Sequence, residues 1–281
     1  MTMKLALLED RSVVKVAGDE AAAFLHGLVT NDVAHIDVGG ARFAALLTPQ
    51  GKILFDFFIY RAPGETGATF LIDCPASAAA DLVKRLGFYC LRAKIAISDE
   101  SAELKVAAFW DGEPPRLPSG FLYVDPRDWR LGFRAILPRT ESAGFAEAPA
   151  DYEAHRISLA APKGGADFAY ADAFPLDVNM DLLNGVDFEK GCYIGQEVVS
   201  RMRHRGGARK RIVRVRFAAA APPAGAPIKS GEATIGALGS SSGAEGLALV
   251  RVDRLAEAQA EGRALTAGGV ALAVEDGAGQ A

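Results

Sequence analysis

The segment EKGCYIGQEVVSRMRHRGG, residues 189–207, holds the densest group of reactive side chains in this chain. Cys192 lies between Gly191 and Gly195, two residues after Lys190. The thiolate form of cysteine is the nucleophile and the metal ligand, and a nearby cation or helix N-terminus favours that form. The segment is therefore compatible with a reactive thiol, a ligand thiol, or a small residue that fills a tight turn.

A helix predicted directly after the cysteine favours the functional interpretations. Residues 196–205 have helical composition, and Gly206 is positioned as a C-terminal stop. Glu197 and Arg201 have the i,i+4 spacing of a favourable pair. The positive end of the helix dipole and the Lys190 ammonium would both stabilise a thiolate at Cys192. We therefore take Cys192 as the candidate functional thiol and Lys190 as its activator.

The remaining cysteines and histidines carry no comparable signal. The three cysteines are widely spaced and form no CxxC pair, which argues against a disulfide framework and against a self-contained zinc or iron–sulfur site. We expect Cys74, in a strand, and Cys90, at a helix end, to be structural. No histidine is marked as a partner base and no GxSxG motif is present, so a hydrolase is disfavoured. No resident metal site is predicted.

Composition and charge limit the partners and the compartment. The chain has 281 residues, a net charge of −4 and a pI near 5.7, which disfavours direct nucleic-acid binding. Residues 201–216 hold eight Lys or Arg and no acid, and we expect them to make local anion contacts. No stretch approaches the roughly 20 apolar residues of a membrane span, and Glu9 and Asp10 interrupt a short N-terminal apolar run. We therefore expect a soluble, cytoplasmic protein with no membrane partner.

The hydrophobic pattern predicts an α+β region followed by a small β-barrel. Strands and helices alternate through residues 1–100, and a similar order of elements fills residues 101–207. Residues 218–227, AAAAPPAGAP, form a proline-containing linker, and short strands with Gly-rich turns follow. We predict a two-lobed α+β region over 1–207 and a C-terminal barrel over 208–281, with RIVRVRF as its first strand.

The motif KGCYIGQE resembles the K-G-C-Y-x-G-Q-E signature of the YgfZ family, which is related to the glycine-cleavage T-protein, an aminomethyltransferase. The match covers Lys190, Gly191, Cys192, Tyr193, Gly195, Gln196 and Glu197. The segments FLHGLVTNDV, LLTPQGKILFDFFIY and NMDLLNGVDFEKGCY are also similar to that family. The resemblance implies a three-lobed α+β folate-binding fold, with a tetrahydrofolate cavity between the lobes. It also implies a role in the assembly, maturation or repair of iron–sulfur proteins, including enzymes that modify tRNA.

The implied folate, tetrahydrofolate or a one-carbon derivative, requires a flat face for the pterin, polar groups for its edge and cations for its tail. Many relatives carry Glu and Gly where this chain has Ser158 and Ala160, so an acidic pterin contact is missing from that segment. The candidate folate contacts are Asn31, Asp32, Tyr152, Arg156, Tyr193, Gln196, Glu197 and Arg201.

Two alternatives stay open beside the folate-binding accessory factor for client iron–sulfur proteins. The first is an aminomethyltransferase-like one-carbon enzyme, although such chemistry does not require a thiol between two glycines. The second is a non-catalytic docking module. The residues do not decide whether the chain catalyses a reaction.

Overall fold

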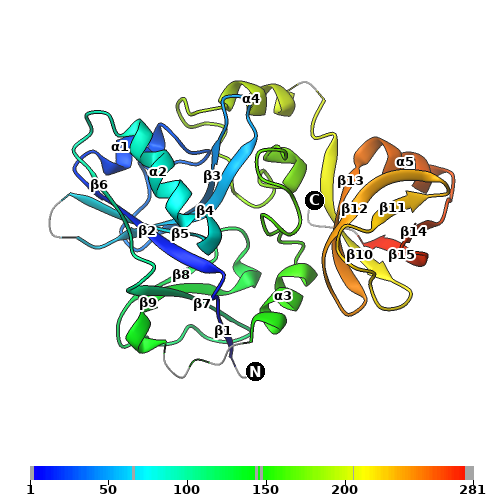
Figure 1. Cartoon of the computed structure of the whole chain (residues 1–281), viewed down its shortest axis with the longest axis horizontal. Helices are drawn as coiled ribbons and strands as arrows, with labels where there is room; N and C mark the ends of the chain where they lie inside the picture. The colour runs from blue at the N-terminus through cyan, green and yellow to red at the C-terminus, as the bar shows by residue number, and fades with distance from the viewer. Residues whose placement is uncertain (1–2, 65–66, 143–144, 146–147, 205, 276–281) are drawn as a thin grey trace.

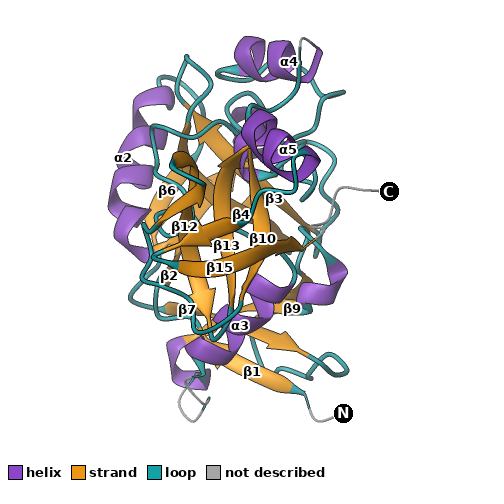
Figure 2. Cartoon of the chain, turned by 90° about the vertical axis from the view of Figure 1, so that its right-hand side faces the viewer, coloured by secondary structure: helices purple, strands orange, loops and turns teal. Residues whose placement is uncertain are grey.

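Two antiparallel sheets and a closed barrel make up the computed structural model, which describes residues 3–64, 67–142, 145, 148–204 and 206–275 (Figure 1). The sheets occupy the left of Figure 1 and the barrel its right. In Figure 2 the helices lie around the strands, with α4 at the top and α3 at the bottom. No helix in the described ranges is long and apolar enough to cross a membrane.

The first sheet has five strands in the order β3-β4-β5-β2-β6. Its helices pack on one face, where alternate strand residues such as Val14, Ile59 and Ile72 meet Leu25 and Leu82. The elements are β2 (Arg11–Gly18), α1 (Ala21–His26), β3 (Ala41–Leu47), β4 (Ile53–Ala62), β5 (Ala68–Pro75), the 3₁₀ turn η1 (Ala76–Ala78), α2 (Ala79–Tyr89) and β6 (Ala96–Asp99).

The second sheet has four strands in the order β1-β7-β9-β8 and packs below the first (Figure 1). Its N-terminal strand precedes the first sheet in sequence yet pairs with β7, which joins the two halves of the α+β region. The elements are β1 (Lys4–Leu7), β7 (Leu104–Trp110), β8 (Phe121–Val124), η2 (Trp129–Leu131), β9 (Phe133–Pro138), η3 (Arg139–Glu141) and α3 (Pro149–Ser158).

The predicted C-terminal barrel is confirmed, and its first strand is β10, as the sequence indicated. Six strands close in the order β10-β13-β12-β11-β14-β15 around an apolar interior. Before it come η4 (Leu176–Val178) and α4 (Gln196–His204); the barrel elements are β10 (Lys210–Phe217), β11 (Pro227–Ser230), β12 (Ala233–Ser242), β13 (Glu245–Arg251), α5 (Val252–Ala260), β14 (Leu265–Ala267) and β15 (Val270–Glu275). The division at residues 207 and 208 stays a proposal, because Arg156 and Asp167 both bond to Ser240 of the barrel.

A buried ion network fastens the two sheets to each other. Asp73 on β5 accepts from Arg11 on β2 and from Arg134 on β9, each at 2.6 Å, and Tyr123 on β8 donates to it at 3.3 Å. Burial alone would raise the pKa of Asp73, but the two guanidinium groups lower it below its ordinary value. The carboxylate therefore stays charged and holds strands of both sheets.

We predict that Asp73→Asn lowers the free energy of unfolding by about 3–5 kcal/mol, because it removes the nearest counter-charge of two buried guanidinium groups and leaves Arg134 only the more distant Asp125, at 3.9 Å. Urea denaturation at pH 7 measures this. The control is Asp111→Asn, which breaks the exposed pair with Lys4 and should cost no more than about 1 kcal/mol. Equal losses in the two variants would contradict the role given to Asp73.

Candidate functional site

Cys192 is exposed and unpaired, whereas Cys74 is buried in β5 and Cys90 is half-buried at the end of α2. The helix α4 begins at Gln196, four residues after the thiol, as predicted. Gly195 adopts φ +80°, and a Cβ there would lie 2.6 Å from the carbonyl oxygen of Thr48. Only glycine permits this close approach, so the loop is seated against the β3–β4 hairpin.

Lys190 anchors the same loop to the end of α1. Its ammonium donates to the carbonyl oxygens of His26 at 2.5 Å, Val29 at 2.7 Å and Asn31 at 3.0 Å. These bonds use all three protons of the ammonium. None is left to bond the thiol, so Lys190 positions the loop that carries Cys192, and its electrostatic activation of the thiol stays a prediction.

The surroundings of Lys190 disfavour its charge. Burial lowers the pKa of Lys190 to about 8, although the carboxylates of Asp32 and Asp187 act in the opposite direction. The ammonium also lies 5.1 Å from the ring centroid of Tyr193, whose pKa burial raises to about 12. Tyr193 therefore belongs to the buried support of the loop.

One histidine, His26, lies beside the cysteine loop, and a second, His35, shares its Asp32 partner; the sequence singled out neither. A Cβ built on Gly191 would lie 3.8 Å from Nε2 of His26. Asp32 holds both imidazoles, with its carboxylate oxygens 3.1 Å from His26 Nδ1 and 2.7 Å from His35 Nδ1. The contact between His26 and Asp32 joins a residue of α1 to the turn that follows it. No pattern of residue spacing in the sequence predicts such a contact. Within the described ranges, no group of three or more His, Cys, Asp or Glu is arranged to hold a metal ion.

The candidate folate contacts do not converge on one cavity. Asn31 lines an open cleft of about 730 Å³ and donates to the carbonyl oxygens of Phe43 and Asn184. Arg201 lines a separate cavity beside the barrel, and the predicted Glu197–Arg201 ion pair does not form in the described part of the chain. The structure therefore brings Asn31, Asp32, Lys190 and Tyr193 together, and leaves Arg201 apart from them.

Tyr152 and Arg156 share a face of α3, as their spacing predicted, and both line a cavity, but their polar groups are already bonded to other residues. The Tyr152 hydroxyl accepts from Arg134 at 3.1 Å, and its ring packs against Trp110. Arg156 is fully buried and donates to Glu153 at 2.5 Å and to Asp167 at 2.9 Å. Both side chains are engaged in joining α3 to its neighbours, and their role as a pterin platform stays a prediction.

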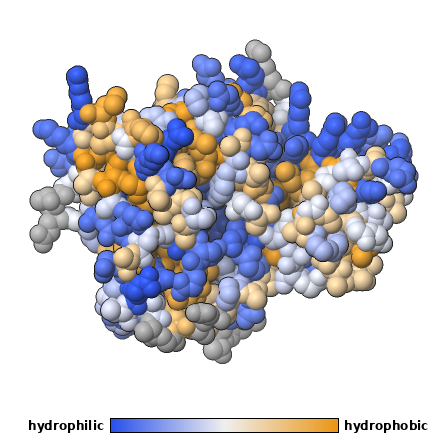
Figure 3. Space-filling view, in the orientation of Figure 1, coloured by the Kyte–Doolittle hydropathy of each residue, from blue (hydrophilic) through white to orange (hydrophobic). Residues whose placement is uncertain are grey.

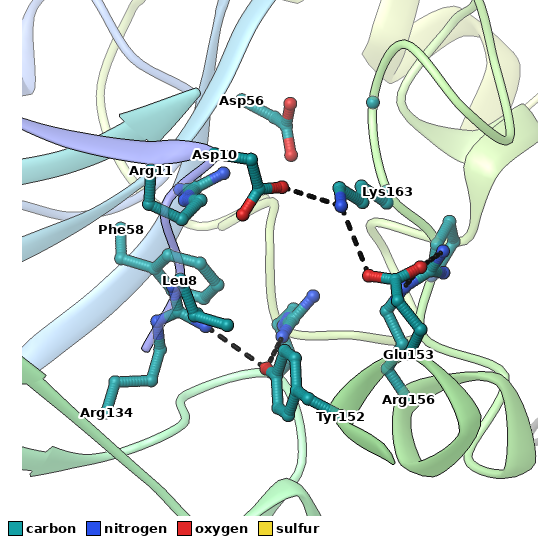
Figure 4. Close-up of a pocket in the computed structure, with 13 residues that line it drawn as sticks. Leu8, Asp10, Arg11, Asp56, Phe58, Arg134, Tyr152, Glu153, Arg156 and Lys163 are labelled. Atoms are coloured by element: carbon teal, nitrogen blue, oxygen red, sulfur yellow. Dashed lines mark hydrogen bonds and ion pairs between the residues drawn. The ribbon is translucent and has the colours of Figure 1, made fainter. Parts of the chain in front are cut away.

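Between the two sheets and α3 lies a central cavity of only about 40 Å³ (Figure 4). Figure 3 shows hydrophilic side chains gathered around the hollow at the centre of the molecule. Lys163 spans the cavity wall, 2.6 Å from Asp10 and 3.1 Å from Glu153, as Figure 4 shows. Tyr170 donates a hydrogen bond to Asp56 on the opposite side.

The residues of the central cavity do not fit a folate as they lie. Pockets for ligands of that size measure about 300–1,000 Å³, far above the 40 Å³ found here. A neighbouring cavity of about 300 Å³ shares Asp10, Glu153 and Lys163 with it. The ion pairs of Lys163 with Asp10 and Glu153 therefore lie in the wall that the two spaces share.

Comparison with known proteins places the chain in a family. Residues 209–277 match the model described as the C-terminal β-barrel domain of CAF17. The mitochondrial iron–sulfur cluster assembly factor IBA57 of Homo sapiens is 31% identical over 279 residues, covering 88% of this chain and 77% of that protein. The mouse protein of that name is 34% identical, covering 78% of this chain and 67% of its own. This chain belongs to the IBA57 family.

A homologue from Mycosarcoma maydis, also named a mitochondrial IBA57 iron–sulfur cluster assembly factor, is 36% identical over 244 residues. The match covers 81% of this chain and 60% of that protein, so the chain spans less than two thirds of its length. The fold is that of the glycine cleavage system aminomethyltransferase T from Bartonella henselae, with a TM-score of 0.77, 18% identity, and coverage of 98% of this chain and 85% of that one. The predicted α+β fold of the T-protein type is confirmed.

The expected cytoplasmic location is contradicted by these relatives, which are named mitochondrial. The expectation rested on the unpaired cysteines and on the lack of a long apolar segment. Cysteine usage reports whether a compartment is oxidising. It does not distinguish one reducing compartment from another.

We predict that the carbonyl-bound Lys190 gives stability a specific pH dependence. Above pH 8 the folded protein has released the proton, while the unfolded chain, with the ordinary value of 10.5, still holds it. The natural chain should therefore gain stability over Lys190→Met between pH 8 and 10.5, by at most about 1.4 kcal/mol per pH unit. Urea denaturation across this range measures the difference.

The control for that titration is Lys84→Met, on the exposed side of α2, whose stability curve should run parallel to that of the natural chain. A Lys190→Met curve that also runs parallel would show that the ammonium is not buried as described.

Proposed function

We propose that this chain is an accessory factor for the assembly, maturation or repair of iron–sulfur proteins, and that Cys192 is the residue that meets the cluster. The support is the family name together with one observation: the signature loop presents an exposed, unpaired thiol. The loop is held in place from behind by Lys190 and Gly195, so the sulfur faces outward without losing its position.

The chain supplies one cluster ligand and needs others from a second protein. Common iron–sulfur clusters are held by four protein ligands, mainly cysteine thiolates. Of the three cysteines, Cys192 is exposed, Cys90 is half-buried and Cys74 is buried. The described residues contain no group of three or more His, Cys, Asp or Glu that could hold a metal ion. Cys192 would therefore act on a cluster that a client or carrier protein also holds, and the cluster is cargo that passes between them.

The resemblance to YgfZ proteins extends the proposal to the clients, which we take to include iron–sulfur enzymes that modify tRNA. The docking-only alternative makes a different prediction for a single atom, the Cys192 sulfur, because a docking loop tolerates its loss. The aminomethyltransferase alternative shares the fold, but it needs a folate, which the central cavity does not accommodate as it stands.

We predict that Cys192→Ala abolishes the support that the chain gives to client activation. Because the side chain is exposed, the free energy of unfolding should change by no more than about 0.5 kcal/mol. The measurement is the recovery of an iron–sulfur enzyme in cells that lack their own factor, with Cys90→Ala as the matched control.

An alkylating reagent provides the check on accessibility, because it should label Cys192 before Cys90 and Cys74. Full activity of both Cys192→Ala and Cys192→Ser would favour the docking-only function.

The second part of the proposal is that the closed central cavity excludes reduced folate, and its test is a thermal titration. With the ion pairs of Lys163 closed, we expect tetrahydrofolate to leave the melting temperature of the natural chain unchanged. Lys163→Ala removes the bridge between Asp10 and Glu153 and should allow the two cavities to join. Stabilisation of the natural chain by about 2.7 kcal/mol, at a hundredfold excess of tetrahydrofolate over its Kd, would show that the central cavity opens without the substitution.

A further inference from the structure

A cavity of about 440 Å³ lies where α4 meets the barrel, and it shares no lining residue with the central cavity. Its walls come from the β3–β4 hairpin, residues 169–177, α4, and strands β10 and β13. Its volume lies within the range typical of small-molecule sites. Neither the folate site that the resemblance implies nor the Cys192 loop accounts for it.

The inner wall of this cavity is apolar. Val198 and Met202 project from one face of α4, with the i,i+4 spacing of helix neighbours. Phe174 and Leu249 face them from the segment before η4 and from the barrel. All four side chains are partly buried, so an apolar ligand would remove a contiguous hydrophobic surface from water.

Cations surround this apolar wall. Arg201, Arg209 and Lys210 line the cavity, are exposed, and make no ion pair within the described residues. Lys52 also lines it, 3.1 Å from Asp172 and 5.3 Å from the ring centroid of Phe174.

The acids of the wall are already engaged. Asp172 pairs with Lys52, and Asp177 is buried and accepts the main-chain N–H of Lys210 at 3.3 Å. Three other basic residues of the run differ from Arg201, Arg209 and Lys210: Arg211 pairs with Asp181, and Arg214 and Arg216 pair with Glu275. The predicted local anion contacts are confirmed for these three, and the positive charge at the cavity is left unbalanced.

We propose that this cavity binds a small organic anion, whose apolar aromatic or alkyl body lies against Phe174, Val198, Met202 and Leu249 and whose carboxylate, phosphate or sulfonate meets Arg201 and Arg209. The ligand would contact α4, the helix that follows the Cys192 loop, and would do so independently of any cluster. Guanidinium groups bind such anions through charge-assisted hydrogen bonds.

The experiment compares two fluorescent probes that share one aromatic body. 8-Anilino-1-naphthalenesulfonate carries a sulfonate, and N-phenyl-1-naphthylamine is its neutral counterpart. We expect the sulfonate probe to bind the native chain at one site and to raise its melting temperature, because a ligand of the folded state stabilises it. The neutral probe should bind at least about tenfold more weakly, since it lacks the charged group.

Charge-reversed variants locate the site. Arg201→Glu with Arg209→Glu should weaken sulfonate binding by about tenfold or more and leave the neutral probe unaffected. Lys84→Glu with Arg85→Glu changes the net charge equally on the exposed side of α2 and should leave both probes unaffected. Circular dichroism checks that each variant is folded. Binding at several sites, equal affinity for the two probes, or equal weakening in both double variants would overturn the proposal.

Discussion

The three hydrogen bonds that the Lys190 ammonium donates to main-chain carbonyls hold the cysteine loop in position. They connect the residue two before Cys192 to the end of α1 and the turn after it. A buried ammonium is costly, and its pKa of about 8 reflects that cost. The three bonds hold the loop, which has two glycines near its thiol, at a fixed place on the first sheet. An exposed cysteine on an unrestrained loop would have no defined orientation toward a partner.

Buried ion pairs also hold together the middle of the molecule. Asp73 with its two arginines joins the sheets, and Arg156 with Glu153 and Asp167 joins α3 to the barrel side. These networks fill the region between the two sheets and α3, where the resemblance implied a tetrahydrofolate cavity, and only about 40 Å³ remains. The centre of the fold is therefore filled with paired side chains. The exposed reactive group, the Cys192 thiol, lies on a surface loop instead.

Local sequence signals predicted the parts that depend on neighbouring residues. Periodicity and turn residues indicated α2, α3, α4 and the barrel strands, and the exposure of Cys192 agrees with its glycine-flanked turn. The helix α5 was missed because its nine residues lie within a run of short strands. Ala160, which stands where relatives usually carry Gly, adopts φ +52° and so retains the left-handed turn without its usual residue.

The parts that were not predictable depend on contacts between distant segments. The Lys190 bonds span about 160 positions of sequence, with |i−j| of 164, 161 and 159. The pairing of β1 with β7 and the burial of Arg156 have the same origin. Helical spacing correctly placed Tyr152 and Arg156 on one face, but it does not say whether that face meets a ligand or a neighbouring strand. The small volume of the central cavity depends on side chains from both sheets and from α3 together, so no single segment of sequence predicts it.

The central claim is that the Cys192 sulfur becomes a ligand of a cluster shared with another protein. The most direct measurement replaces that sulfur with selenium, as selenocysteine at position 192, and mixes the chain with a carrier protein loaded with a [2Fe–2S] cluster. Selenium-edge X-ray absorption then reports the neighbours of that one atom. The account predicts a selenium–iron distance that appears only with the loaded carrier. A spectrum that shows selenium bonded to carbon alone, under conditions in which the chain promotes cluster transfer, would contradict it.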